Sequence, residues 1–284
     1  MQVKAPVDFC GNNGGMQGTA LLVSMPGSMP ARPRAGAIFL PKEHGSWSLA
    51  LEPLALGLLV APSFAGGAFT VVALAGFFAR RPFKTLVAPG ATRRPGSRNA
   101  VWIFSILGMV GLALVLVLAG ITPLWPLLLA APLGGVFAWF DAQNGSRASA
   151  AEVAGSATFA LLPAALATLA GWSAGPALAL AALALARNVP TVLTVRSALR
   201  RAKGEAGGFG FPLIASLGAA LGLTVLGARG FLPPWAVLPA WVLLARTLWF
   251  ASRWRPSWSA RRVGMLEAVL GLGYLITITV VYLR

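Results

Sequence analysis

Two carboxylates and the only histidine of the chain lie close together in the segment PKEHGSWSLALEPLALGLL, which begins at Pro41. The chain has only seven acidic residues and one histidine, yet Glu43, His44 and Glu52 fall within ten positions. An ionisable residue inside an apolar membrane segment is costly, and it is therefore a candidate functional site. We take Glu52, His44 and Glu43 as the candidate catalytic, acid–base residues.

A helix that begins near Lys42 would bring three polar side chains onto one face. His44, Ser48 and Glu52 are spaced four residues apart, and residues at that spacing lie above one another on a helix. This face must point into the protein because lipid offers no polar partner. His44 titrates near neutral pH and could shuttle a proton, or it could act only as an interfacial hydrogen-bond donor.

The composition is that of an integral membrane protein. Hydrophobic residues make up 57% of the chain, charged residues make up 11%, and the mean hydropathy is +0.76; soluble domains average about 25% charged residues. The apolar runs are continuous, which predicts helices rather than the alternating strands of a barrel. The basic residues behind the net charge of +16 lie mostly between these runs, which indicates membrane orientation and not nucleic-acid binding.

Nine apolar runs are long enough to cross a bilayer, so we predict an all-α polytopic bundle of about nine transmembrane helices. With the N-terminus in the cytoplasm and the C-terminus outside, all but four of the 23 Lys and Arg lie in inside segments, as the positive-inside rule requires. The inside loops are also the longer ones, and long loops tend to carry function. The predicted spans are 46–61, 65–79, 100–119, 121–140, 150–171, 175–195, 210–228, 231–251 and 263–282.

The chain is predicted to have one folded domain. Residues 1–38 are rich in Gly and Pro and should form a flexible tail, whereas residues 39–284 form a single transmembrane helical domain. Initiation at Met29 is an alternative explanation of the tail. The chain has a single cysteine and no HExxH, CxxC or P-loop motif, so we expect no metal site and no cofactor.

Two arginines lie inside predicted spans and could meet Glu52. Arg187 is in the sixth span and Arg246 in the eighth, both at a depth similar to that of Glu52. Asn188 and Pro190 follow Arg187, and we expect Pro190 to interrupt the helix there, as in broken helices that line a cavity. The alternative is a purely structural ion pair of Glu52 with one arginine, since breaking a buried pair costs roughly 3–5 kcal/mol.

A second basic group lies at the end of the second span, in ARRPFKTLV. Arginine forks match phosphate oxygens, so these residues could join those of the sixth and eighth spans in a basic pocket for a phosphorylated headgroup. The alternative is that they only anchor the spans at the inner surface. The predicted ligand-binding residues are Arg80, Arg81, Lys84, Arg187, Asn188, Arg196 and Arg246.

The other carboxylates are interpreted as structural. Glu152 fits a capping box with Ser149 as the N-cap. Glu267 shares a helix face with Gly271 and Tyr274, and we expect it to pair with Arg261 or Arg262. The segment FDAQNG at 141–146 has the chemistry of a turn.

The first motif resembles the signature of the YwiC-like family of bacterial integral membrane proteins. The pattern P-x-E-H-G-x-W is matched from Pro41 to Trp47, and the blocks ARRPFKTLV, 147–155 and ARNVPTVLTVRSALRR are similar to later parts of that family. The resemblance covers most of 37–284 and implies a multi-pass protein of the bacterial inner membrane. It carries over no catalytic roles.

A more distant resemblance is to UbiA-type membrane prenyltransferases. These have nine helices, and their cytoplasmic loops after helices two and six carry aspartate-rich motifs for magnesium and pyrophosphate. The corresponding places here contain no aspartate, so magnesium would lack oxygen ligands. An enzyme of this kind would be related to prenyltransferases but would lack their magnesium motifs.

The sequence is compatible with three functions. The first is a cytoplasm-facing basic cavity that binds or transforms an isoprenoid or other lipid phosphate. The second is a proton-coupled transporter in which Glu52 carries the proton. The third is a non-catalytic membrane assembly or partner protein. Membrane lipids are expected partners in each case, an anionic amphiphile is the expected ligand in the first, and nucleic acid is not expected.

Overall fold

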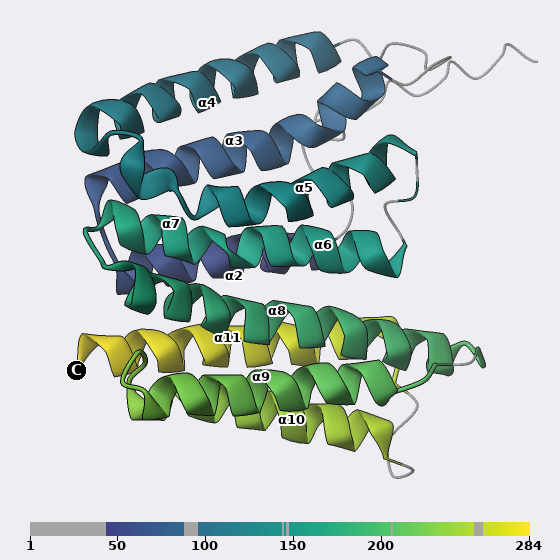
Figure 1. Ribbon diagram of the computed structural model, residues 1–284. Coiled ribbons are helices and arrows are strands. Elements are labelled where there is room, and N and C mark those ends of the chain that lie inside the picture. The colour runs from purple at the N-terminus through teal and green to yellow at the C-terminus, as the bar shows by residue number, and fades with distance from the viewer. Residues whose placement is uncertain (1–43, 88–95, 144, 146–147, 206, 253–257) are drawn as a thin grey trace, which may run out of the picture. The chain divides into compact units, whose positions relative to one another are not determined.

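The computed structural model describes residues 44–87, 96–143, 145, 148–205, 207–252 and 258–284, all of which belong to the compact unit Ala35–Arg284. Within this part every regular element is a helix (Figure 1). The predicted tail 1–38 and Glu43 lie outside the described residues.

The helices match the nine predicted spans in order. The fifth span consists of two helices that meet at Leu161, and the fourth and eighth begin with a short 3-10 helix. The elements are α2 (His44–Val60), α3 (Phe64–Val87), α4 (Ser97–Ala119), η1 (Thr122–Leu124), α5 (Leu127–Ala142), α6 (Ser149–Ala160), α7 (Leu162–Leu169), α8 (Ala174–Ala202), α9 (Gly210–Ala228), η2 (Pro234–Val237), α10 (Leu238–Ala251) and α11 (Ala260–Leu283).

Six of the spans in the described part are long and apolar enough to cross a membrane, and α2 and α5 contribute shorter apolar stretches. The chain is therefore an all-α, multi-pass membrane protein, as the apolar runs predicted. Most large side chains of α4 are exposed, including Trp102, Met109 and Val117. Such a surface is suited to acyl chains, because lipid is the solvent of a membrane-spanning helix.

Two helices, α3 and α8, differ from the predicted boundaries or shape. α3 continues past the predicted end of its span to Val87, and α8 continues to Ala202. Arginine and lysine are good helix formers, so the basic residues extend these helices instead of beginning loops. The expected break near Asn188 was wrong, because α8 is helical through Pro190. A proline removes only one backbone donor, and neighbouring helices make this tolerable in a membrane.

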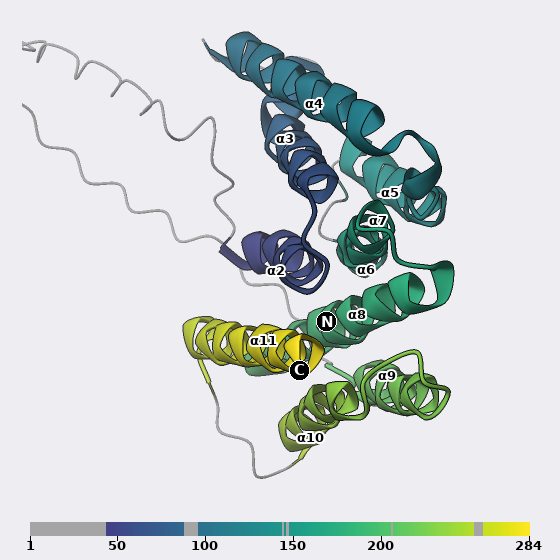
Figure 2. The same cartoon turned by 90° about the vertical axis from the view of Figure 1, so that its left-hand side faces the viewer.

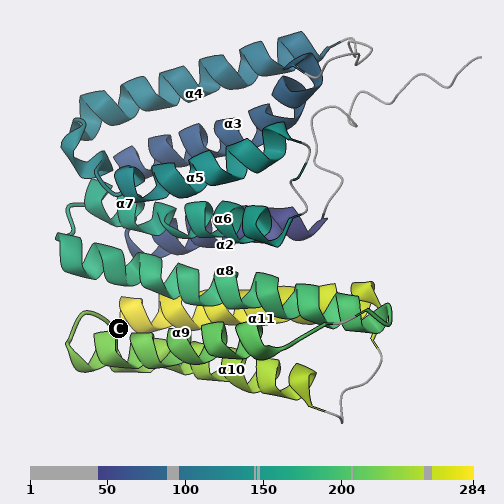
Figure 3. The ribbon, with the colours of Figure 1, turned by 45° about the vertical axis from the view of Figure 1, so that its right-hand side comes forward.

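Helix α2 lies in the interior of the arrangement. α2 packs against α11, α6, α7 and α8, and Figure 2 shows it between α3 and α11. Figure 3 shows α8 between the α6–α7 span and α9, in agreement with its contacts with all three helices. The α3–α4 pair and the α9–α10 pair flank these central helices on two sides.

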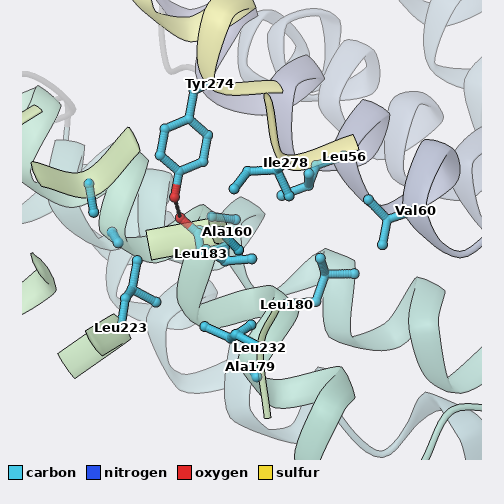
Figure 4. Close-up of a cluster of buried hydrophobic side chains, with 14 of the residues drawn as sticks. Leu56, Val60, Ala160, Ala179, Leu180, Leu183, Leu223, Leu232, Tyr274 and Ile278 are labelled. Carbon is cyan, nitrogen blue, oxygen red and sulfur yellow. Dashed lines mark hydrogen bonds between the residues drawn. The ribbon is translucent and has the colours of Figure 1, made fainter. Parts of the chain in front are cut away.

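The largest hydrophobic cluster surrounds α8. Leu180 and Leu183 are fully buried among side chains of α2, α9 and α11 (Figure 4). Many members are alanines, which let helix backbones approach closely in a membrane. Tyr274 of α11 also enters this cluster, and its hydroxyl donates a hydrogen bond of 2.8 Å to the Leu183 carbonyl. The cluster therefore fixes α11 against the same turns of α8 that precede Arg187.

One glycine determines how closely α2 and α7 approach. A Cβ at Gly57 would lie 3.0 Å from the Leu166 Cβ and 3.2 Å from its Cγ, whereas a Cβ at Gly67 in α3 would meet nothing within 4 Å. We predict that Gly57→Val destabilises the protein by about 1–3 kcal/mol through overpacking. The measurement is the Tm of the purified protein in detergent. Gly67→Val is the matched control and should leave the Tm nearly unchanged; equal effects would contradict the packing argument.

Candidate functional site

Glu52 points into the protein and meets an arginine of α8. Its Oε2 lies 3.3 Å from the Nε of Arg187, whose side chain is only 5% exposed, whereas the Glu52 side chain is 20% exposed. Of the two arginines that could have met Glu52, the structure selects Arg187. Glu52 therefore has a charged partner within the bundle, as its position in an apolar segment requires.

A second carboxylate joins this pair from α11. The Oε2 of Glu267 lies 3.2 Å from Arg187 Nη1, and its Oε1 lies 3.2 Å from Arg246 Nη1. Arg187 Nη2 also donates a hydrogen bond of 2.8 Å to the backbone carbonyl of Glu267. Two carboxylates and two guanidinium groups from α2, α8, α10 and α11 thus form one cluster, which we call the ion-pair cluster.

The contact of Glu267 with the two interior arginines was not predicted from the sequence. The expected pairing with Arg261 or Arg262 was wrong, because those two side chains lie exposed in the first turn of α11 whereas Glu267 is buried. The available signal was the shared face with Gly271 and Tyr274, since all three are buried on the side of α11 that faces the protein. A carboxylate on such a face needs an interior cation.

A threonine hydroxyl connects the two arginines. Arg187 Nη1 and Arg246 Nη2 both donate hydrogen bonds to Thr191 Oγ1, the second at 3.0 Å. Thr191 lies one turn after Arg187 on α8, so helix geometry places its hydroxyl beside the guanidinium. Two like charges can share this oxygen because Glu267 contacts both of them.

The cluster depends on a residue without a side chain. A Cβ at Gly271 would lie 2.7 Å from both Arg187 Nη2 and Glu52 Cδ. Glycine therefore allows α11 to approach the Glu52–Arg187 pair closely.

Several polar atoms of the cluster are buried without a hydrogen-bond partner in the described part of the chain. They are Arg187 Nε, Arg246 Nε, Arg246 Nη1 and Glu267 Oε1. Their charges are close to opposite charges, but their hydrogen bonds are not all satisfied. Unsatisfied buried polar groups are uncommon in folded proteins and often mark functional positions.

A narrow pocket borders one side of the cluster. Its accessible volume is about 10 Å³, and it is lined by Glu52 and Arg187 together with Asn188, Gly271 and Tyr274 among others. A water molecule needs at least about 10–15 Å³ of such space, so the pocket has room for about one water molecule. Asn188 is held at its edge, where its Nδ2 donates a 3.3 Å hydrogen bond to the Ser156 carbonyl.

The basic residues of α3 form a separate group with a carboxylate of α5. Arg80 makes two hydrogen bonds to Asp141, at 3.0 and 2.9 Å, and Lys84 Nζ donates another at 2.9 Å. Asp141 lies in the last turn of α5, which ends at Ala142, so the turn expected for 141–146 begins later than predicted. Arg80 also lies over the Phe137 ring, 4.3 Å from its centre. This group, which we call the α3–α5 clamp, joins two helices.

The clamp changes the titration of its carboxylate. Burial alone would raise the pKa of Asp141, but the hydrogen bonds from Arg80 and Lys84 outweigh it, and the pKa lies below the ordinary value of 3.8. Asp141 lies just beyond the predicted span 121–140. Its charged form is therefore favoured in the folded protein.

The remaining predicted site residues lie elsewhere in the bundle. Arg196 is on α8, and its Nη1 donates a 2.6 Å hydrogen bond to Glu152 Oε2. The capping box predicted for Glu152 was wrong, because α6 begins at Ser149 itself and its N-cap, Ala148, makes no side-chain cap. Arg81 follows Arg80 on α3. His44 is the first residue of α2, but its side chain lies outside the described part.

The helices and their charged interior are those of a multi-pass membrane protein. A comparison with known protein families finds a match to part of the chain. The model of a family described as YwiC-like protein matches residues 40–168. The predicted resemblance is confirmed for this part, which includes Glu52 but not Arg187, Arg246 or Glu267. No curated protein and no solved structure matches the chain, so the more distant resemblance to UbiA-type prenyltransferases stays a prediction.

The close approach at Gly271 predicts a strong effect of one methyl group. Gly271→Ala should force Glu52 and Arg187 apart and destabilise the protein by about 1–3 kcal/mol. Gly273→Ala on the same helix is the control, because a Cβ there would meet nothing within 4 Å. Thermal unfolding of both variants in detergent measures the difference, and a Gly271→Ala protein as stable as the control would contradict the geometry.

The clamp predicts a pH-dependent contribution to stability. The pKa of Asp141 is lower in the folded protein than its ordinary value of 3.8. The ion pairs of Asp141 therefore add to the free energy of unfolding above pH 3.8, and this addition is lost as the pH falls through the folded pKa. Asp141→Asn should lower stability at pH 7 by about 1 kcal/mol, as for a partly exposed ion-pair network. The difference in Tm from the wild type should shrink below pH 3.8. A difference that stays constant down to that range would exclude the ion pair as its cause.

Proposed function

We propose that this protein binds an anionic group, such as the phosphate of an isoprenoid or other lipid, at Arg187 in the cytoplasmic half of a bacterial inner membrane. Glu52 serves as the internal counter-ion that the ligand displaces. The observation that carries the proposal is the buried guanidinium of Arg187, which borders the pocket and has an Nε without a hydrogen bond.

The contacts of Arg187 support displacement of Glu52 and not of Glu267. Glu267 contacts Arg187 through both its carboxylate and its backbone carbonyl, at 3.2 and 2.8 Å. Glu52 lies 3.3 Å from the Nε of Arg187, and it is the more exposed of the two carboxylates. The less constrained carboxylate is the one that an incoming anion can replace at lowest cost.

The small pocket determines how a ligand enters. With room for little more than one water molecule, it admits a phosphate only when Glu52 turns away from Arg187. The Arg187 side chain then exchanges one anionic partner for another. Phosphate oxygens match an arginine fork well, so the exchange keeps the buried charge satisfied.

The charge distribution supports entry from the cytoplasm. The ends of α3 and α8 and the start of α11 carry basic residues, which we assign to the inner surface by the positive-inside rule. In this orientation the N-terminus is cytoplasmic and the C-terminus is outside. Arg80, Arg81, Lys84 and Arg196 attract anions toward this surface, and Glu43 and His44 precede Glu52 in the sequence.

The test is binding of a fluorescent isoprenyl diphosphate to the purified protein in detergent. Because a charge-assisted hydrogen bond contributes about 1.5–3 kcal/mol, Arg187→Ala should weaken binding about 10–100-fold. Arg187→Lys keeps the charge but loses the fork, and it should show a smaller loss; this variant covers the case in which Arg187→Ala fails to fold. Arg200→Ala is the control, because Arg200 pairs with Glu205 on the exposed surface.

The competitors define which part of the ligand is recognised. Inorganic pyrophosphate should compete if the anion is the determinant, whereas a prenyl alcohol should compete if only the chain is bound. Unchanged binding by both Arg187 variants, or competition by the alcohol alone, would contradict the proposed function.

A further inference from the structure

We propose that binding of an anion at Arg187 takes up one proton, and that Glu52 accepts this proton. The inference rests on the proposed function and specifies how it is regulated. It predicts that pH, through a residue buried beside the ligand, controls the affinity for the anion.

The charges of the ion-pair cluster balance one another when no ligand is bound. The four charged groups in contact are Glu52, Arg187, Glu267 and Arg246. Two negative charges offset two positive charges, so the cluster is neutral before a ligand arrives. An additional anion would bring an uncompensated negative charge into a region of low dielectric, where such a charge is expensive. Uptake of one proton by a carboxylate of the cluster offsets one unit of that added negative charge.

Of the two carboxylates in the cluster, Glu52 is the one suited to accept the proton. Neutralising Glu267 would leave Arg246 without its acidic partner, because Glu267 is the carboxylate that contacts it. Neutralising Glu52 removes only the contact with Arg187, and the ligand replaces that contact. Glu52 also lines the pocket and is 20% exposed, compared with 10% for the Glu267 side chain. Glu52 is therefore the carboxylate that water and protons can reach.

Few other ionisable groups of the described residues lie near Glu52. Arg187 faces it from α8, and Glu267 and Tyr274 lie beside it on α11. The Tyr274 hydroxyl donates to a backbone carbonyl, and so it is not free to deliver a proton. The ionisable residues on the other helices packed against α2 are Glu152 of α6 and Arg80, Arg81 and Lys84 of α3, while α7 has none. On α2 itself, the His44 side chain lies outside the described part.

The replacement of the Glu52 carboxylate by the anion at Arg187 requires the transfer of one proton and no other chemical step. In the unliganded state the carboxylate of Glu52 contacts Arg187. In the liganded state the anion contacts Arg187, and Glu52 is a neutral carboxylic acid that has gained one proton from the surrounding water. A protonated carboxyl also becomes a hydrogen-bond donor, so it can turn and donate to the bound anion.

The test measures proton uptake by calorimetry. Isoprenyl diphosphate is titrated into the wild type and into Glu52→Gln in two buffers of different ionisation enthalpy, such as HEPES and Tris. Protonation of the ligand itself contributes equally to both proteins, so the difference between them isolates Glu52. The wild type should take up about one proton more than Glu52→Gln. Glu205→Gln, a change in an exposed pair, should behave as the wild type does.

The pH dependence provides a second measurement. Glu52→Gln leaves the cluster with an excess positive charge, so it should bind the anion at least about tenfold more tightly than the wild type where Glu52 is ionised. In the pH range in which Glu52 is ionised, the affinity of the wild type relative to that of Glu52→Gln should fall about tenfold for each unit by which the pH rises. This slope is expected for one linked proton.

The outcomes separate the two proposals. Equal proton uptake by the wild type and Glu52→Gln, with binding still lost in Arg187→Ala, would overturn proton linkage and leave the anion site intact. Absence of binding by every variant would overturn both proposals. Melting temperatures of all variants show whether each is folded when it is titrated.

Discussion

The arrangement of the central helices depends on balancing the charges of two arginines buried inside a membrane protein. Arg187 and Arg246 are both buried, and an unpaired guanidinium at that depth would cost several kcal/mol. Four helices must therefore meet where these arginines lie, because their acidic partners come from α2 and α11. The packing of small residues around α8 and the absence of a side chain at Gly271 are conditions for that meeting. Hydrophobic burial alone would not select this arrangement, since lipid is as apolar as the interior.

The cluster combines strong charge compensation with incomplete hydrogen bonding. Its ion pairs neutralise one another, yet atoms on both arginines and on Glu267 have no aligned partner among the described residues. A cluster built only for stability would be expected to satisfy these atoms, because partly satisfied polar networks are worse than apolar packing. The clamp between α3 and α5 is different: Asp141 accepts aligned hydrogen bonds from two basic residues. We therefore interpret the clamp as structural and the ion-pair cluster as the functional centre.

The sequence was informative where a local property decides the outcome. The length of each apolar run predicted the spans, and the cost of a charge in lipid predicted that Glu52 points inward and meets an arginine. It was less informative where the outcome depends on which helices become neighbours. Glu267 finds Arg187 and Arg246 because α11 packs against α2 and α8, and Glu152 finds Arg196 across two helices. No spacing within a single segment encodes those contacts. The narrowness of the pocket beside Glu52 was likewise not predictable, because it results from the fit of three helices.

The hydroxyl of Thr191 has a consequence for communication across the bundle. One oxygen accepts hydrogen bonds from both guanidinium groups, so a shift of either arginine changes the strength with which the other is held. Next to Arg246 on α10, Thr247 lies within hydrogen-bonding distance of Thr194 and Ser216, at 3.2 and 3.0 Å. Polar contacts of α10 thus reach both α8 and α9 beside the ion-pair cluster. The two arginines are thus joined twice, through the Thr191 hydroxyl oxygen and through the Glu267 carboxylate.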